Sequence, residues 1–174
     1  ELSFATSTIE VQGQAGGVTR DITQVREPYS SAKFNHDGWF TYIDLTPEQA
    51  QSMMTATDEG ILSLSDSATN LMFADSGGFH VTDGVNTATV NPSFAANAKM
   101  RVLAYADKDA NVLGIGYRNL PSGSFTWATE QAYNDTIPSG SWINQMYGNQ
   151  HIWQVHGWKV FNKHKDQTYY EDNY

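Results

Sequence analysis

Apolar and polar residues alternate in short segments along most of the chain, and Gly, Asn, Asp, Ser and Pro separate these segments. An alternation with period two is typical of a β-strand with one buried face, and the separating residues favour turns. Residues 38–46 alternate most clearly, so they are predicted to form a strand with two distinct faces. One face carries Trp39, Thr41, Ile43 and Leu45, and the other carries Phe40, Tyr42 and Asp44.

The alternating segments recur about every 8–12 residues, a spacing that is typical of antiparallel sandwiches and barrels. No regular helical patterns lie between them, as a parallel βαβ fold would need. The sequence therefore predicts an all-β antiparallel fold, a sandwich or a barrel. The expected strands cover residues 2–11, 38–46, 61–65, 69–75, 78–82, 86–91, 99–107, 111–118, 124–131, 141–147 and 155–162.

One segment carries the signals of a helix start. Thr46 stands at an N-cap position, Pro47 would be the first helical residue, and Gln49 occupies the capping-box position. We therefore expect one short helix near residues 47–57.

The chain is predicted to be a single β-sandwich domain over residues 1–174. Its 40% hydrophobic, 17% charged and 13% aromatic content indicates a packed domain that is unusually rich in aromatic rings. Residues 12–36 are polar and contain several glycines, so a long loop is expected there. The polar tail, residues 164–174, contains three tyrosines, and we expect it to pack along the body or to bind a neighbouring chain. The chain begins at Glu1, as a mature form or an excised domain would.

Charge and cysteine content exclude several classes of function. Ten basic and nineteen acidic residues give a net charge of −9, and no basic cluster is visible, so neither nucleic acid nor an anionic membrane surface is an expected partner. No apolar run approaches the ~20 residues of a membrane span, so membrane insertion is not expected. The absence of cysteine excludes disulfides, thiolate nucleophiles and cysteine-based metal sites.

Motifs of enzyme chemistry are not found. No strand carries the closely spaced carboxylates of a glycosidase, and no Gly-x-Ser-x-Gly elbow is present. Gly114 and Gly116 lie inside an apolar strand pattern, where glycine permits close sheet packing and does not indicate a phosphate loop. No catalytic residue is therefore predicted.

Metal-ligand patterns are also weak. Residues 107–111 match the first half of a Ca²⁺ loop, but Val112 stands where the loop needs glycine. The histidines form no helical pair, so no metal site is predicted. Ca²⁺ is the one cofactor left open, in a looser site formed by loop carboxylates such as Asp66, Asp75 and Asp83.

Aromatic side chains are concentrated in the C-terminal third, between residues 125 and 161. Aromatic rings pack on the apolar faces of sugars, and amide groups bind the sugar hydroxyls. We expect Phe125, Trp127 and Trp158 to pack inward. The predicted ligand-binding residues flank or form a polar loop, and they are Trp142, Tyr147, Asn149, Gln150, His151 and Trp153.

Three stretches together resemble the concanavalin A-like, laminin-G-like family of jelly rolls. "GILSLSD…NLMFADSGGFHVTDGVNTATV" is similar to the strand and two hairpins in the middle of that fold, and "KMRVLAYADKDANVLGIGYRN" to its long strand pair. "TIPSGSWINQMYGN…VHGWKVFNK" resembles its closing segment. The resemblance covers about residues 37–163, and it implies a two-sheet jelly-roll sandwich.

The resemblance also implies a set of functions, of which a non-catalytic, lectin-like carbohydrate-binding module is the expected one. Its partner would be a surface glycan, and its carrier an extracellular bacterial adhesion protein or a phage tail fibre. The expected location is therefore extracellular or on a virion surface. Weak single sites gain from multivalency, which favours a homo-oligomer, a trimer if the domain belongs to a fibre.

Two other functions remain open. A polysaccharide lyase or glycosidase on the same fold would use Tyr117 with Arg118 or Arg101, or His80. The more conservative interpretation of Arg101 is a structural arginine paired with a carboxylate. A structural or assembly domain of a virion or cell-surface complex is the third function.

Overall fold

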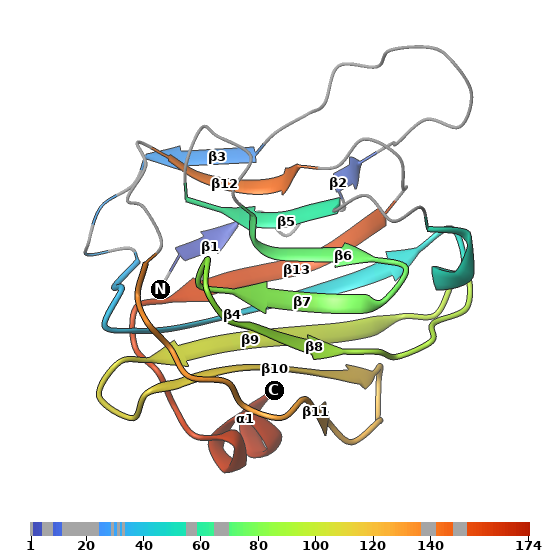
Figure 1. Cartoon of the computed structure of the whole chain (residues 1–174). Helices are drawn as coiled ribbons and strands as arrows, with labels where there is room; N and C mark the ends of the chain where they lie inside the picture. The colour runs from blue at the N-terminus through green and yellow to red at the C-terminus, as the bar shows by residue number, and fades with distance from the viewer. Residues whose placement is uncertain are drawn as a thin grey trace.

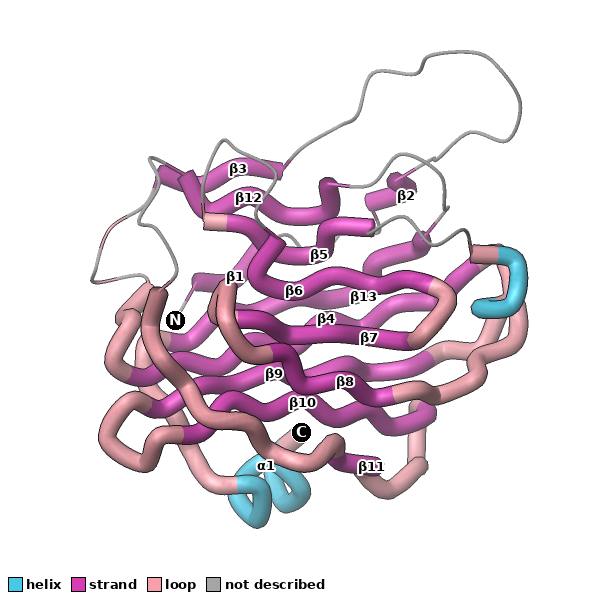
Figure 2. The backbone as a smooth tube through the Cα atoms, viewed as in Figure 1, coloured by secondary structure: helices cyan, strands magenta, loops and turns pink. Residues whose placement is uncertain are grey.

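The computed structural model contains two antiparallel sheets that pack face to face (Figures 1 and 2). It describes residues 2–4, 9–11, 25–28, 30, 32, 34–54, 59–64, 70–136, 142–147 and 153–174. The seven-stranded sheet has the order β1 (Leu2–Phe4), β13 (Trp153–Phe161), β4 (Gly38–Pro47), β9 (Met100–Asp107), β10 (Val112–Asn119) and β11 (Thr126–Trp127), and β2 (Ile9–Val11) also pairs with β13. The six-stranded sheet has the order β3 (Val25–Pro28), β12 (Trp142–Tyr147), β5 (Glu59–Ser63), β6 (Asn70–Asp75), β7 (Gly78–Thr82) and β8 (Thr87–Val90).

The main core lies between the two sheets, and the alternation along β4 builds one wall of it. Each of the four residues predicted for one face, Trp39, Thr41, Ile43 and Leu45, is at most 1% exposed. Thr41 is tolerated in this core because its hydroxyl donates to the carbonyl of Lys159 and accepts from Trp158 Nε1. Trp158 is 3% exposed, so its prediction as a core residue is confirmed.

A second apolar cluster lies on the outer side of the seven-stranded sheet. Phe40 of β4 and Leu103 and Tyr105 of β9 point to this side, and α1 (Gln167–Asn173) covers them with the fully buried Tyr170. In Figure 1, α1 lies beside β10 and β11. The polar tail therefore does pack along the body, and it does so as a short helix that the sequence did not predict.

The start of α1 follows ordinary capping rules. Asp166 is the N-cap, and its side chain accepts a hydrogen bond from the backbone N–H of Tyr169 at 2.8 Å. The hydroxyl of Tyr170 in turn accepts from the backbone N–H of Lys165 at 2.8 Å. The buried tyrosine thus satisfies its polar atom while its ring fills the cluster. No helix in the described ranges has the length and apolar character of a membrane span.

The helix expected near residues 47–57 is wrong. Thr46 and Pro47 form the end of β4, where they pair with Gln154 and Trp153 of β13. In the described part of this segment only a single 3-10 turn follows, η1 (Gln51–Met53), and residues 55–58 lie outside the described ranges. The capping signal was local, whereas pairing with a strand over 100 residues away decided the conformation.

The other strand boundaries agree with the prediction to within about two residues, with three exceptions. Residues 2–11 hold two short strands, β1 and β2. β3 lies within residues 12–36, where a loop was expected, and pairs with β12. Of the expected strand 124–131, only β11 and an isolated bridge from Gln131 to Leu113 are present.

Two glycines of β10 let aromatic rings lie directly on the sheet. A Cβ atom at Gly114 would lie 2.2 Å from Tyr105 Cζ, and one at Gly116 would lie 2.3 Å from Trp127 Cε3. Both distances are too short for real contacts, so the rings need the bare backbone. The prediction that these glycines permit close packing is confirmed.

Replacement of Gly116 by alanine is expected to displace Trp127 and to lower the free energy of unfolding by about 1–3 kcal/mol, as overpacking does. Gly157→Ala is the matched control, because a Cβ there would meet only Asp44 Oδ2 at an ordinary 3.7 Å. Urea unfolding of both variants measures the difference. Equal stability of the two variants would contradict the close approach of Trp127 to β10.

Candidate functional site

Of the six sequence-predicted site residues, the structure describes the backbone of Trp142, Tyr147 and Trp153. Trp142 and Tyr147 are the two ends of β12 in the six-stranded sheet. Trp153 begins β13 in the seven-stranded sheet, where it pairs with Pro47 and Val11. Asn149, Gln150 and His151 lie outside the described residues. The ligand-binding role of these six residues stays a prediction.

A continuous aromatic surface lies elsewhere, on the outer side of the seven-stranded sheet around α1. We call it the aromatic face, and its partly exposed members are Tyr42, Phe125, Trp127, Phe161 and Tyr174. Phe125 stacks on Trp127 with ring centroids 4.7 Å apart, and Phe161 stacks on buried Phe40 at 4.1 Å. The expectation that Phe125 and Trp127 pack into the sandwich is therefore wrong, since both pack against its outer side.

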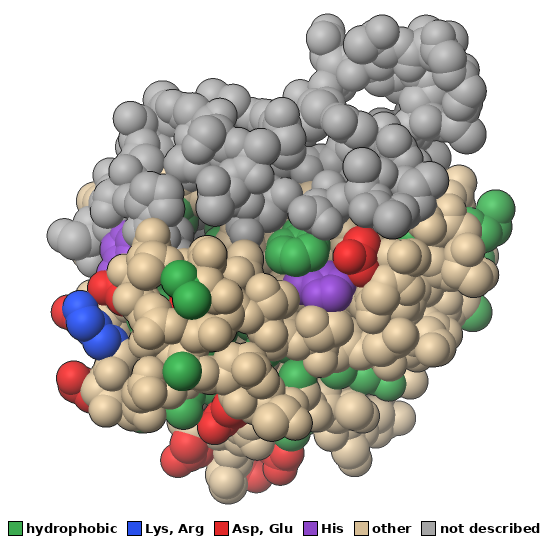
Figure 3. All heavy atoms as spheres, viewed as in Figure 1, with side chains coloured by type: hydrophobic (Ala, Val, Ile, Leu, Met, Phe, Trp, Pro, Cys, Tyr) green, Lys and Arg blue, Asp and Glu red, His purple; other side chains and the backbone are tan. Residues whose placement is uncertain are grey.

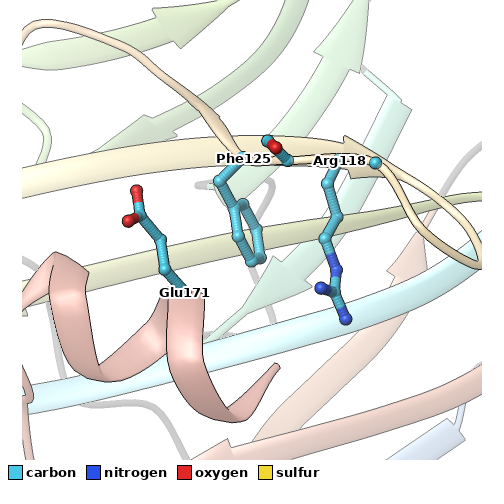
Figure 4. A pocket seen from close by; sticks show the side chains of 5 residues that line it. Arg118, Phe125 and Glu171 are labelled. Carbon is cyan, nitrogen blue, oxygen red and sulfur yellow. The ribbon is translucent and has the colours of Figure 1, made fainter.

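A hollow of about 260 Å³ opens at the edge of the aromatic face. Arg118 from the end of β10, Gly123, Ser124 and Phe125 from the following loop, and Glu171 from α1 line it. In Figure 4 the ring of Phe125 lies between the side chains of Arg118 and Glu171. The hollow is smaller than the ~300–1,000 Å³ of sites for drug-sized ligands, so its size suits a single sugar ring or a similar small group.

The two charged residues of the hollow have different surroundings. Glu171 is exposed, and its Oε1 accepts a hydrogen bond from Trp127 Nε1 at 2.8 Å. The guanidinium carbon of Arg118 lies 5.3 Å from the centre of the Phe125 ring, and its buried Nε has no hydrogen-bond partner. Partial burial, followed by the charge of Arg101, lowers the pKa of Arg118.

Arg101 is paired, as its conservative interpretation predicted. Its Nε and Nη2 donate to the two carboxylate oxygens of Asp44 at 2.6 and 2.7 Å, and its Nη1 donates to the carbonyl of Tyr174. Burial opposes the charge, but the hydrogen bonds and the charge of Asp44 outweigh it and raise the pKa of Arg101. The bidentate pair joins β9 to β4, and the bond to Tyr174 ties the C-terminal end of α1 to the sheet.

The residues proposed for a lyase do not come together. Tyr117 packs against the main core, whereas Arg118 lies on the outer side of the same strand. His80 lies on the six-stranded sheet, where its Nε2 is 2.7 Å from Asp75 Oδ1 and its Nδ1 is 2.8 Å from Thr89 Oγ1. Tyr117, Arg118 and His80 therefore occupy separate surfaces, and Arg101 is paired with Asp44.

The loop carboxylates suggested for Ca²⁺ bind protein groups where they are described. Asp75 bonds His80 and the backbone N–H of Gly77, and fully buried Asp83 accepts from the backbone N–H groups of Val85, Asn86 and Asn134. Asp66 lies outside the described residues. Within the described ranges, no group of three or more histidines and carboxylates is placed to hold a metal ion. Asp75 and Asp83 therefore do not fit a Ca²⁺ site in this arrangement.

On the face drawn in Figure 3, lysine and arginine side chains gather at one edge only. This distribution agrees with the absence of a basic cluster in the sequence. The hollow beside Arg118 brings together a charge, an aromatic wall and hydrogen-bonding groups.

Solved structures similar to this chain were found, whereas the sequence searches matched nothing. No family model and no curated protein matches the sequence. The binding domain of botulinum neurotoxin DC, in complex with SialylT, superposes with a TM-score of 0.63 at 12% identity, covering 95% of this chain and 40% of that chain. Lectin I from Ulex europaeus, in complex with the methyl glycoside of α-L-fucose, gives a TM-score of 0.53 at 12% identity, with 90% and 87% covered. The exoplasmic/lumenal domain of VIP36, in its Ca²⁺/Man3GlcNAc-bound form, gives 0.54 at 10% identity, with 99% and 86% covered.

These neighbours define the fold of the chain. All three have the concanavalin A-like lectin fold, and this chain shares it, as the quoted sequence stretches predicted. The chain spans less than half of the neurotoxin domain and most of the two lectin-type domains. At such low identity the similarity shows the fold alone, and any binding site depends on the residues of this chain.

His164 makes the aromatic face sensitive to pH. Burial lowers the pKa of this imidazole, whereas Asp107, Glu130 and Asp166 raise it more weakly. Its ring stacks on Tyr105 at 5.1 Å, and its Nδ1 lies 3.1 Å from the hydroxyl of Tyr170. The folded protein therefore favours the neutral ring.

We expect stability to fall as the pH drops below the ordinary histidine pKa of 6.5. The unfolded chain then takes up a proton that the folded chain resists, and this loss continues down to the folded pKa. His164→Gln should reduce the difference between the urea midpoints at about pH 7.5 and about pH 5.5. An unchanged difference in the variant would show that the ring titrates equally in both states.

Proposed function

We propose that this domain binds carbohydrate without acting on it, as a lectin-like module. The observation that carries the proposal is the hollow beside the Phe125–Trp127 stack, which combines an aromatic wall with polar groups at its ends. Solved neighbours with the same fold include proteins captured with glycans, which supports the same class of ligand here. The recognition would rest on C–H groups packing against the rings and on hydrogen bonds to the hydroxyls.

The hollow would be one contact region, and the residues predicted from the sequence would be another. Phe125 lines the hollow itself. Trp153 belongs to the same seven-stranded sheet, at the start of β13, with Tyr147 at the end of the preceding strand in the other sheet. We propose that the glycan contacts both regions, and substitution of Phe125 or Trp153 distinguishes their contributions.

The biological setting belongs to the proposal too. A small hollow with few hydrogen-bonding groups gives weak affinity for a single sugar, so several linked copies would be needed for firm attachment. We therefore propose a surface glycan as the partner, a homo-oligomeric carrier, and an extracellular or virion-surface location such as a bacterial adhesion protein or a phage tail fibre. The net charge of −9 supports the exclusion of nucleic acid from the partners.

A glycan array tests this function directly. Wild type should bind at least one group of related glycans. Phe125→Ala should weaken that binding about tenfold, the loss expected when an aromatic wall worth 1–1.5 kcal/mol is removed. Trp153→Ala tests the predicted second region in the same way, and Tyr169→Ala is the aromatic control, because Tyr169 is exposed on α1 and does not line the hollow.

The outcomes separate the alternatives. Loss with Trp153→Ala alone would move the site to the loop between β12 and β13. Binding that survives both changes would remove both regions from the site. A wild-type protein that binds no glycan, and that light scattering shows to be a stable oligomer, would overturn the lectin proposal in favour of an assembly domain. Release of reducing ends or unsaturated products from polysaccharides would instead indicate an enzyme.

A further inference from the structure

Three charged residues lie side by side on the outer side of the seven-stranded sheet. They are one aspartate and two arginines, so a single carboxylate faces two guanidinium groups. The strand register places Asp44 of β4 opposite Arg101 of β9, and Arg101 opposite Arg118 of β10. Both carboxylate oxygens of Asp44 already accept from Arg101. Among the described residues no carboxylate forms an ion pair with Arg118, although the chain carries a net charge of −9.

The side chain of Arg118 is also held where an unpaired donor is costly. Its Nε is buried without a hydrogen-bond partner, and a buried donor in that state carries an uncompensated desolvation cost. The like charge of Arg101 adds to that cost, and the charge of Asp44 offsets it only in part. A planar anion bound to the outer guanidinium nitrogens through two parallel hydrogen bonds would neutralise the charge that Arg101 opposes.

The remaining walls of the hollow select among anions. Phe125 provides an apolar surface next to the guanidinium, and Ser124 lies beside it in the same loop. Glu171 lines the hollow on the other side of the Phe125 ring (Figure 4). A second negative charge of the ligand would be repelled by Glu171, whereas hydroxyl groups would donate to it. The walls therefore favour a ligand with a carboxylate at one end and hydroxyls at the other.

We propose that this hollow binds a sugar that carries a carboxylate, with the carboxylate on Arg118, the apolar face of the sugar against Phe125, and its hydroxyls near Glu171. This inference rests on the proposed function and deepens it by naming an acidic sugar as the ligand class. A plain anion would use only Arg118, and a neutral sugar would leave Arg118 unpaired. The volume of about 260 Å³ suits one such ring.

The test is an NMR titration of the whole chain with a matched pair of ligands, methyl β-glucuronide and methyl β-glucoside, which differ in the carboxylate. Inorganic phosphate is the third probe and reports on anion binding without a sugar. Arg118→Gln removes the positive charge, and Arg118→Lys keeps the charge but lacks the planar guanidinium group. Lys163→Gln is the control, because it removes one exposed positive charge outside the hollow. Because Arg118 has no ion pair in the described residues and its buried Nε has no partner, Arg118→Gln is expected to unfold at a urea concentration no lower than that of wild type.

We expect the glucuronide to bind at least about tenfold more tightly than the glucoside, and its shifts to centre on residues 118–125 and 171. Arg118→Gln should abolish this preference, Arg118→Lys should retain part of it, and Lys163→Gln should keep it. Added salt should weaken the glucuronide and leave the glucoside unchanged.

Three results would overturn the inference. Equal affinity for the two glycosides would show that the site binds neutral sugars. Phosphate binding as tight as that of the glucuronide would show a simple anion site. The absence of NMR shifts with every probe would show that the hollow is not a binding site. A neutral glycan that binds in the array through Trp153 would keep the proposed function standing while this inference fails. Failure of the array as well would remove both.

Discussion

The central strands β4, β9 and β10 carry apolar side chains on both faces, so this sheet has to be covered on both sides. On the inner side the six-stranded sheet buries Trp39, Ile43 and their neighbours. On the outer side α1 places Tyr170 over Phe40, Leu103 and Tyr105. At about 25 cal/mol per Å² of apolar surface removed from water, a sheet with one open side would forgo much of its stabilisation. The short C-terminal helix is thus part of the sandwich's stability.

That second covering layer also creates the hollow. Because β10 offers bare glycine backbone, Trp127 can lie flat on it, and Phe125 can stack on Trp127 at the margin of the layer. α1 reaches this margin with Glu171, which fixes the indole through a hydrogen bond at 2.8 Å. The apolar layer ends there, and its polar rim is where solvent, and hence a ligand, meets the aromatic rings.

The contrast between Arg101 and Arg118 shows how neighbouring residues of one kind acquire different roles. They face each other across β9 and β10, yet among the described residues only Arg101 forms an ion pair, with both carboxylate oxygens of Asp44. Arg101 therefore serves the fold by tying the sheet to Tyr174. Arg118 forms no ion pair in the described part of the chain and lines the hollow, and its buried Nε has no hydrogen-bond partner. The fold that this chain shares with lectins does not fix such details, so they must come from the side chains of this chain.

The sequence by itself determined most of the strands, the two faces of β4 and the core position of Trp158, because side-chain alternation and burial preferences are local properties. It also offered the paired state of Arg101 as the more conservative of two interpretations. It also supported the jelly-roll fold through three stretches of pattern. The tertiary structure decided the end of β4, since pairing with β13 overrode the helix signal at Thr46 and Pro47. It also decided the hollow, whose walls come from β10, the following loop and α1. Local periodicity says which residues are buried, whereas only the long-range packing of the chain says which distant segments meet, and that meeting turned Phe125 outward to the site.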